Sequence, residues 1–567
     1  METLELNAAV TQNWLAALCI CSGRCVMAAN GESASQAWSD QFTQSVLEWF
    51  AISATDQAHI KALPYGDAAN DMVLLMLRCK RADEEAAEAD IASTSLSLGM
   101  ASDPEKMYSG LLLTCLGIGE RQLELLEGWQ EDSGSRRAAA ATGGVPLLRP
   151  FAYDARSRAT AFVISDWLDM PKQVVSAYEA RIASGLEQVA AKAKLGDASA
   201  KALEDERRRK WGWRKYLAAG AGVAVAGTLV GVTAGLAAPL LAAGMGAVGI
   251  GGLGFLATAG GSAMIGSLLG IAGGGLIGKR FNTRLRGLRE FYFTRLPMAT
   301  AGSEVSAHFL HATVLVPGFL NGAASTSPFA PIAGVMGLDL GEAYTLYYET
   351  EELVALQGAF ANFVNSTAKN TAVSLILKQT ILSVLIGALT WPLAILKLGQ
   401  LIDTPWAVGL ERAKRAGKLL ADVLINRAHG DRPVTLVGYS LGALTIFACL
   451  QEMHKRKAFG IVEVAVLLGM PADSTAKNAW LAACQCVSRR VIVGYSKNDW
   501  ILAFLFRANA LCANLTGLTG LDTDALFRQQ PLVRRKVVNV DLAETIAQHS
   551  DYLAKIDDVM LELSRHF

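Results

Sequence analysis

The sequence has no excess of charge of either sign, because 52 Lys and Arg residues offset 52 Asp and Glu residues over 567 positions. A protein that holds nucleic acid needs a basic surface to neutralise phosphates, so this balance argues against a nucleic-acid partner. Charged residues are also scarce at 18%, whereas apolar residues make up 52% and the mean hydropathy is +0.29. This composition excludes a disordered chain and indicates that part of the protein lies in a membrane.

Cysteine and histidine are few, with nine and seven residues. Cysteine at this density does not build a disulfide scaffold, and the acidic N-terminus lacks the positive charge of a secretory signal. Cysteines cluster at Cys19, Cys21 and Cys25 and again at Cys484 and Cys486, but no nearby histidine completes a zinc spacing. We therefore expect reduced, buried thiols, and neither a metal nor an organic cofactor.

The first third of the chain is predicted to be helical. Charged and apolar residues alternate at helical spacing in Gln44–Ala51, Met72–Glu88 and Leu111–Gly128, and strand-like runs are few. A chain of this length exceeds one ordinary core. We divide it into a helical region at 1–200, a Gly/Ala-rich segment at 201–300 and a third domain at 301–567.

The middle segment contains 63 consecutive residues without a charge, at positions 216–278. This length allows two membrane spans of about 20 to 25 residues each, joined by a short turn, or three tight spans. Glycines four residues apart, as in Gly227 and Gly231, let membrane helices approach closely, and the Lys and Arg residues at both flanks favour keeping both ends in the cytosol. We expect a membrane-embedded hairpin, with a glycine-rich hairpin buried in a soluble core as the alternative.

A second apolar stretch, Gln379–Leu396, is long enough to be considered as a span. It contains Pro392 and lies between predicted strands of the third domain, so a span here would interrupt that domain's sheet. We therefore favour a core or capping helix for this stretch.

Short apolar runs alternate with helical segments from about residue 305 onward. The runs expected to be strands are Ala312–Val316, Ala343–Tyr348, Val434–Val437, Val462–Leu468, Arg490–Val493 and Lys536–Val540. A long helical stretch, Glu351–Asn426, separates the second run from the third. This alternation predicts an α/β fold with a mostly parallel sheet covered by helices on both faces.

The third of these runs leads directly into Gly438-Tyr-Ser440-Leu-Gly442, and a helix is expected to follow. G-x-S-x-G between a buried strand and a helix is typical of the nucleophile elbow, which lifts a serine hydroxyl above the sheet edge. Gly438 and Gly442 are expected to be glycine because a Cβ atom there would collide with the neighbouring strand and helix.

Partners for Ser440 follow in the order acid, then histidine, that α/β-hydrolases use. Asp499 comes after the run Arg490–Val493, and His549 comes after the last run. His454, in the helix after the elbow, and His566, beside the C-terminus, compete less well for the histidine. Asp473 and Asp541 are the competing acids, and Asp499 is preferred because it lies in the turn after the penultimate strand.

An oxyanion hole needs two backbone N–H donors beside the serine. The N–H of Leu441, at the start of the helix after the elbow, is one expected donor. The N–H of Phe319, in the turn Pro317–Phe319 after the first strand, is the other. The alternative for this turn is a simple end to the strand.

Several long motifs together resemble the eukaryotic transmembrane and coiled-coil domain-containing protein 4 family over residues 145–567. They include the basic, Trp-rich stretch 207–216, residues 401–406, 432–442 and 493–500, and the pair formed by 539–541 and 549–552. The resemblance implies an α/β-hydrolase domain after a membrane hairpin, with Ser440, Asp499 and His549 in the matching motifs, and a membrane-associated, lipase-like activity. One position departs from the family pattern, because Phe319 stands where a Trp is expected.

The leading hypothesis is thus a membrane-associated serine hydrolase that cleaves an ester, with a membrane lipid or another apolar ester as substrate and the catalytic domain facing the cytosol. Thioesters and peptides are not excluded by the residues. The alternative is a non-catalytic membrane scaffold that keeps the fold and recruits trafficking proteins through the helical N-terminal region. A pore is disfavoured because residues 216–278 have no ionisable group to line a path.

Overall fold

A computed structural model of the chain describes short stretches before residue 180, chiefly 36–49 and 153–167, and then most of the C-terminal half. In that half the described residues are 288–296, 309–322, 327–368, 393–427, 429, 432–508 and 514–567. The predicted hairpin at 216–278 lies outside the described residues, as do most of Gln379–Leu396, Cys19, Cys21 and Cys25. Among the helices that the structure describes, none is both long and apolar enough to cross a membrane.

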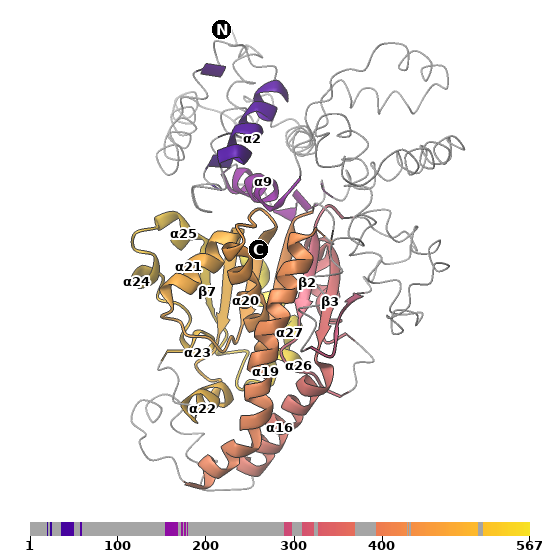
Figure 1. The fold of residues 1–567 in the computed structure, drawn as a ribbon, viewed down its shortest axis with the longest axis vertical. Coiled ribbons are helices and arrows are strands. Elements are labelled where there is room, and N and C mark those ends of the chain that lie inside the picture. The colour runs from indigo at the N-terminus through magenta and orange to yellow at the C-terminus, as the bar shows by residue number, and fades with distance from the viewer. Residues whose placement is uncertain are drawn as a thin grey trace, which may run out of the picture. The chain divides into compact units, whose positions relative to one another are not determined.

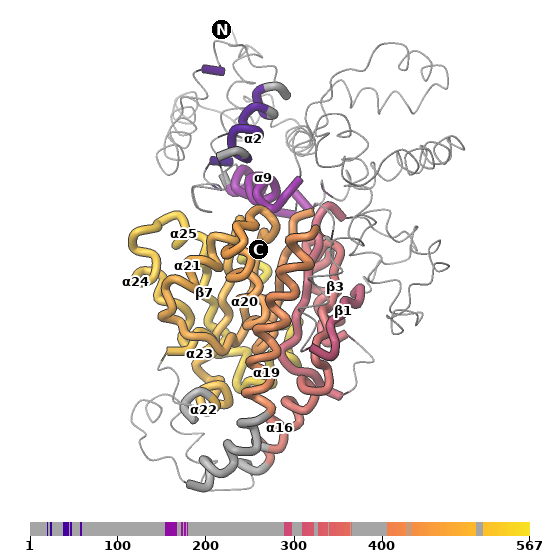
Figure 2. The backbone as a smooth tube through the Cα atoms, in the orientation of Figure 1, coloured from indigo at the N-terminus to yellow at the C-terminus, as the bar shows by residue number. Residues whose placement is uncertain are grey.

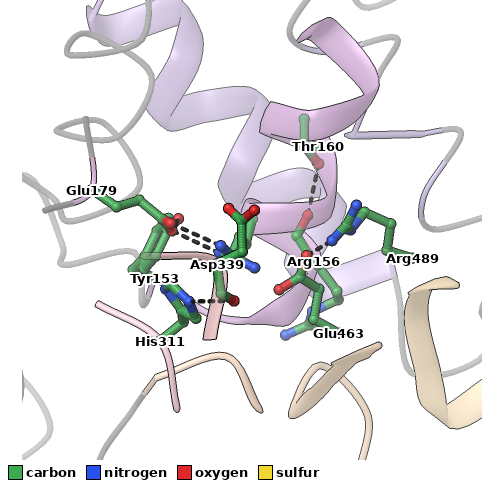
Figure 3. A network of polar contacts seen from close by, with 9 residues as sticks. Tyr153, Arg156, Thr160, Glu179, His311, Asp339, Glu463 and Arg489 are labelled. Atoms are coloured by element: carbon green, nitrogen blue, oxygen red, sulfur yellow. Dashed lines mark hydrogen bonds and ion pairs between the residues drawn. The ribbon is translucent and has the colours of Figure 1, made fainter. Parts of the chain in front are cut away.

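The chain divides into two compact units. The first contains the helices α2 (Gln36–Trp49) and α9 (Ala155–Trp167). In this unit the Trp38 and Phe42 rings stack with centroids 4.8 Å apart, and the Arg158 guanidinium donates to both carboxylate oxygens of Glu179 at 2.8 and 2.9 Å. Tyr153 also donates to Glu179 (Figure 3).

The second unit contains a seven-stranded sheet in the order β1-β3-β2-β4-β5-β6-β7. Figure 1 shows two neighbouring strands of this sheet, β2 and β3, side by side. The strands are β1 (Phe291–Arg295), β2 (Ala312–Val316), β3 (Glu342–Tyr348), β4 (Val434–Tyr439), β5 (Val462–Leu468), β6 (Val487–Tyr495) and β7 (Val537–Asp541). Every neighbouring pair is parallel except β1 and β3, which are antiparallel. The prediction of a mostly parallel α/β sheet is confirmed.

In the described part of this unit, helices lie between the strands and follow the last strand. They are α15 (Ile332–Met336), α16 (Thr350–Ala368), α19 (Leu393–Ile425), α20 (Leu441–Lys455), α21 (Lys477–Cys486), α22 (Trp500–Ala508), α23 (Thr516–Thr519), α24 (Thr523–Phe527), α25 (Pro531–Lys536), α26 (Asp551–Ala554) and α27 (Ile556–Leu563), with short 3-10 turns at Gly337–Leu340 and Ser564–His566. Figure 2 shows helix α19 running beside α20. Helix α19 also packs against α16. The short helix α15 packs on α27.

The central strands β2, β3, β4 and β5 are buried along their whole length. Most residues of β2, β4 and β5 are Val, Leu or Ala, and β3 contributes buried tyrosines. Strands buried on both faces are the kind that a sheet covered by helices on both sides requires. Strand β1 precedes residue 301, where the sequence suggests that the third domain begins. The sequence pattern did not predict this strand, because β1 lies at the edge of the sheet and has the partly polar sequence Phe-Tyr-Phe-Thr-Arg.

Two polar contacts lie near the amino-terminal ends of the strands, away from the site described below. Glu463 on β5 accepts a hydrogen bond from the Arg489 guanidinium on β6 at 2.6 Å, and both side chains are almost fully buried (Figure 3). A ring nitrogen of His311 lies 3.3 Å from the Asp339 carbonyl oxygen. These contacts stabilise the ends of strands and take no part in the arrangement around Ser440.

Candidate active site

Ser440 stands between strand β4 and helix α20 in a strained backbone conformation. Its φ is 54° and its ψ is −122°, a region that residues with a side chain rarely adopt. Such strain persists only where surrounding contacts hold it, and it is found at functional sites more often than elsewhere. The Ser440 N–H donates to the Leu468 carbonyl at 2.8 Å, so the turn remains tied to the neighbouring strand β5.

The two glycines of the motif have different neighbours. A Cβ on Gly438 would lie 2.8 Å from the Gly442 carbonyl carbon and 2.9 Å from the Ala443 nitrogen, inside helix α20. A Cβ on Gly442 would lie 1.9 Å from the Val316 carbonyl oxygen at the end of β2. Both positions therefore require glycine, since the strand, the helix and β2 approach one another at backbone distance.

The structure brings Ser440, His549 and Asp499 together, although they are far apart in sequence. His549 Nε2 lies 2.6 Å from Ser440 Oγ, and His549 Nδ1 lies 2.5 Å from Asp499 Oδ2. All three side chains have no solvent exposure. The imidazole thus joins a hydroxyl to a carboxylate in a series of buried hydrogen bonds, and these can orient the ring and take a proton from the hydroxyl.

Backbone contacts position the carboxylate of Asp499. Its Oδ1 atom accepts the Leu502 N–H at 3.0 Å, which is the N-cap pattern at the start of α22, while Oδ2 faces His549. The helix N-terminus favours a negative charge at this place. One oxygen therefore anchors the side chain and leaves the other for the imidazole.

The turn after β2 packs directly on the elbow. A Cβ on Gly318 would lie 2.1 Å from the Tyr439 carbonyl oxygen and 2.5 Å from the Leu441 nitrogen. Tyr439 Oη donates to the Phe319 carbonyl oxygen at 2.6 Å, and the Leu320 N–H donates to the Leu353 carbonyl at 3.2 Å. The Phe319–Leu320 peptide is thus held on both sides.

The two expected oxyanion donors lie on these neighbouring segments. Within the described part of the chain, no protein atom accepts the backbone N–H of Phe319 or of Leu441. A buried N–H without an acceptor is rare and calls for a ligand or a water. Both N–H groups can therefore donate a hydrogen bond to an oxygen atom of a ligand.

Aromatic rings surround His549. The ring centroids of Phe319, Phe360 and Tyr552 lie 5.5, 5.6 and 5.8 Å from that of the imidazole. Trp406 on α19 packs against Phe360, with ring centroids 6.1 Å apart. Burial raises the pKa of the Tyr552 and Tyr439 hydroxyls well above their usual value, so both stay protonated. The aromatic rings that contact the imidazole are therefore uncharged.

The competing residues lie elsewhere. Asp473 Oδ1 accepts two hydrogen bonds from Thr475, and its side chain is partly exposed. Asp541 caps its own turn by accepting the Ala543 N–H at 3.0 Å. His454 faces Gln485, 2.9 Å away, at the far end of α20. None of these side chains contacts Ser440.

Sequence reasoning missed Tyr439, Phe360, Trp406 and Tyr552 as neighbours of the site. Tyr439 and Tyr552 lie beside the motif residues Ser440 and His549, so proximity in sequence could have drawn attention to them. Phe360 and Trp406 come from helices α16 and α19, and only the packing of these helices brings them to the imidazole. No pattern marks Phe360, and Trp406 is marked only by its place in the stretch 401–406 that carries the family resemblance.

Cysteines are buried among apolar side chains rather than grouped with histidine or carboxylate. Cys449, Cys484 and Cys486 are free thiols, and burial raises the pKa of Cys484 and Cys486 to about 12. The structure, over the residues it describes, contains no cluster of His, Cys, Asp and Glu able to hold a metal ion. The three thiols are therefore part of the packing.

A strained serine above a parallel sheet, hydrogen-bonded in series to a histidine and an aspartate, defines an α/β protein with the arrangement that serine hydrolases use. Comparison with known proteins then identifies the family. Residues 209–565 match the family described as "Protein of unknown function (DUF726)", which is more than half of the chain, so the chain belongs to this family.

Curated relatives come from plants, animals and fungi. The chain is 33% identical over 435 residues to the transmembrane and coiled-coil domain-containing protein STS1 of Oryza sativa subsp. japonica, covering 73% of this chain and 62% of that protein. It is 34% identical over 351 residues to an uncharacterized membrane protein of Caenorhabditis elegans, covering 61% and 54%. It is 44% identical over 183 residues to the probable lipase MIL1 of Saccharomyces cerevisiae, covering 32% and 17%.

The chain thus spans less than two thirds of the length of each of these relatives. No solved structure matches the chain. Two of these relatives are named as membrane proteins, and the third is named as a probable lipase.

Proposed function

We propose that this protein is a serine hydrolase of the α/β-hydrolase type that cleaves an ester bond, with Ser440 as nucleophile, His549 as general base and Asp499 as the residue that orients the imidazole. The observation that carries the proposal is the series of hydrogen bonds from Ser440 Oγ through His549 to Asp499, at 2.6 and 2.5 Å, built on a strained elbow. A buried serine needs neither this strain nor a histidine partner for stability alone.

In the proposed reaction Ser440 Oγ attacks the ester carbonyl carbon while its proton moves to His549 Nε2. The carbonyl oxygen becomes an oxyanion that accepts the backbone N–H groups of Leu441 and Phe319. His549 then gives the proton to the departing alcohol, which leaves an acyl group on Ser440. Water attacks this acyl group with the same base, and the acid is released.

Lipid esters are the substrate class that we favour. The rings of Phe319, Phe360 and Tyr552 around His549 suit an apolar acyl chain better than a charged substrate. The name of the yeast relative, probable lipase, points the same way.

Membrane association, with the α/β domain on the cytosolic side, is part of the proposal. It draws on the uncharged stretch 216–278 and on the membrane-protein names of relatives. Within the family, the name of the rice relative supports a place near the transmembrane and coiled-coil domain-containing protein 4 group.

Labelling with a fluorophosphonate tests the proposal, because this probe bonds covalently only to an activated serine. We expect the wild-type chain to be labelled and Ser440→Ala to lose the label. The control is Ser564→Ala, which should keep the label, because Ser564 lies in a surface turn and its hydroxyl donates only to the Leu561 carbonyl. A wild-type protein that takes no label would favour the non-catalytic scaffold. Equal labelling of Ser440→Ala would assign the reaction to another serine.

A further inference from the structure

His549 is held in place by a loop that has no secondary structure of its own. Strand β7 ends at Asp541, and the His549 loop, defined here as residues 542–550, runs from there to helix α26. Asp499 belongs to a second segment, the Asp499 turn, defined as residues 495–499, which begins at the last residue of strand β6. A productive site needs the two segments fixed relative to each other to within a fraction of an ångström.

Three hydrogen bonds connect the two segments. The Leu542 N–H donates to the Tyr495 carbonyl at 2.8 Å, Asn498 Nδ2 donates to the Ala543 carbonyl at 2.8 Å, and Ser496 Oγ donates to the Ile546 carbonyl at 2.7 Å. The contacts follow one another along the first half of the His549 loop. The Asp499 turn therefore supports the loop as well as supplying the acid.

The turn is also braced internally. Ser496 Oγ accepts the Asn498 N–H at 3.2 Å while it donates to Ile546, and the Asp499 N–H donates to the Ser496 carbonyl at 3.2 Å. Ser496 is fully buried. Its hydroxyl thus connects the backbone beside Asp499 to the backbone three residues before His549.

The second half of the loop is held from the other side of His549. Asp551 Oδ2 accepts the Ala547 N–H at 3.0 Å and the Gln548 N–H at 3.4 Å. Lys555 Nζ donates to the Thr545 carbonyl at 2.7 Å. The backbone that leads to His549 is consequently held by residues that precede it and by residues that follow it in the chain. The polar residues Ser496, Asn498 and Asp551 thus acquire a role that the three-residue arrangement alone does not give them.

We propose that Ser496 and Asn498 are positioning residues, which act on the reaction of Ser440 by fixing the His549 loop against the Asp499 turn. The inference rests on the hydrolase function proposed above. Neither side chain contacts Ser440, so loss of either changes the placement of the imidazole and not the identity of the reacting groups. Misplacement by about 1 Å costs on the order of a hundredfold in rate.

The chain offers a matched control. Asn539 on β7 donates from Nδ2 to the Leu521 carbonyl at 2.8 Å and accepts the Leu521 N–H at 3.0 Å. It therefore makes side-chain to backbone hydrogen bonds like those of Asn498, in the same unit, without touching the His549 loop. Asn539→Ala measures what losing such bonds does to the fold alone.

The experiment compares full-length Ser496→Ala, Asn498→Ala and Asn539→Ala. We expect the first two to react with a fluorophosphonate at least about tenfold more slowly per folded molecule, with kcat for p-nitrophenyl butyrate reduced and KM within about twofold. Ser496→Thr, which keeps the hydroxyl, should recover most of the rate. Asn539→Ala should melt at a lower temperature and react at the wild-type rate.

Wild-type rates in Ser496→Ala and Asn498→Ala would overturn the inference, as would an equal loss of rate in Asn539→Ala. Thermal melts give the folded fraction, and Ser496→Thr provides a mild variant if Ser496→Ala does not fold. These results can be told apart from a failure of the proposed function. If the proposed function is wrong, either the wild type does not react with the probe or Ser440→Ala still reacts.

Discussion

The hydroxyl of Tyr439 donates a hydrogen bond to the backbone carbonyl of Phe319 at 2.6 Å. This bond joins the residue before Ser440 to the turn after β2, where one oxyanion donor is proposed. The two rings also pack edge to face, with centroids 5.0 Å apart. The elbow and the proposed oxyanion turn are therefore one rigid assembly, and its parts can be tested separately.

Tyr439→Phe should lower kcat for p-nitrophenyl butyrate by about tenfold, because the Phe319 peptide loses its side-chain anchor while the ring packing remains. Steady-state kinetics measure the effect. Tyr344→Phe is the control, since Tyr344 is equally buried and donates to Glu342 at 2.6 Å away from the site. If both variants lose rate to the same extent, the Tyr439 hydroxyl has no special relation to the oxyanion turn.

Asp499→Asn should lower turnover by about a thousandfold to ten thousandfold, since an amide no longer fixes the histidine tautomer or stabilises the imidazolium. Asp473→Asn, whose carboxylate bonds only to Thr475, should change turnover little. Esterase rates of the two variants decide the point. The opposite ranking would assign the acid role to the strand before β6.

Gly442→Ala should unfold the domain or prevent its expression, because the added Cβ would lie 1.9 Å from the Val316 carbonyl oxygen and neither backbone can retreat. Gly358→Ala, on an exposed face of α16 with nothing within 4 Å, should stabilise the protein by about 0.5 to 1 kcal/mol. Thermal melts of both variants test these expectations. A Gly442→Ala protein with wild-type stability would contradict the close approach of β2 to the elbow.

Lys536 makes stability depend on pH in an unusual direction. Burial lowers its pKa from 10.5 to about 7. Between these values the unfolded chain binds more protons than the folded chain, so the contribution of Lys536 to stability rises with pH through this window and is least favourable below about pH 7. Lys536→Met should flatten the rise in melting temperature between about pH 7 and pH 9.

Lys418 is exposed, so Lys418→Met serves as the matched control. This variant should show the same dependence of melting temperature on pH as the wild type. A parallel profile for wild type and Lys536→Met would show that the buried amine stays charged in the folded protein. Lys536 Nζ donates to the Val487 carbonyl at 2.7 Å, so a small loss of stability at high pH accompanies the substitution.

The full chain should remain with membranes through alkaline carbonate and high salt, because burial of the uncharged stretch 216–278 in lipid is not screened by ions. Deletion of this stretch should release the protein, and protease added outside sealed vesicles should reach both flanks. Release of the full chain by carbonate would favour the buried glycine-rich hairpin. Flanks on opposite faces would mean an odd number of spans.

Local sequence determined the elements and the order of the site residues. Buried strands in this sheet are continuous apolar runs, so Ala312–Val316 and Val462–Leu468 can be found to the residue, and the glycines around Ser440 mark the turn. Edge strand β1 and the full length of β6 were harder to find, because partly exposed strands carry polar residues such as Arg489 and Arg490 that interrupt the apolar pattern.

The tertiary structure alone decided which side chains meet. His549 is 50 residues from Asp499 and 109 residues from Ser440 in the sequence. The distances of 2.5 and 2.6 Å between their side chains follow from the order of β4, β5, β6 and β7 in the sheet. Phe360 reaches the imidazole because α16 packs beside α19, and Ser496 reaches Ile546 because β6 pairs with β7. Contacts between distant segments depend on how whole elements pack, and a pattern of neighbouring residues does not encode them.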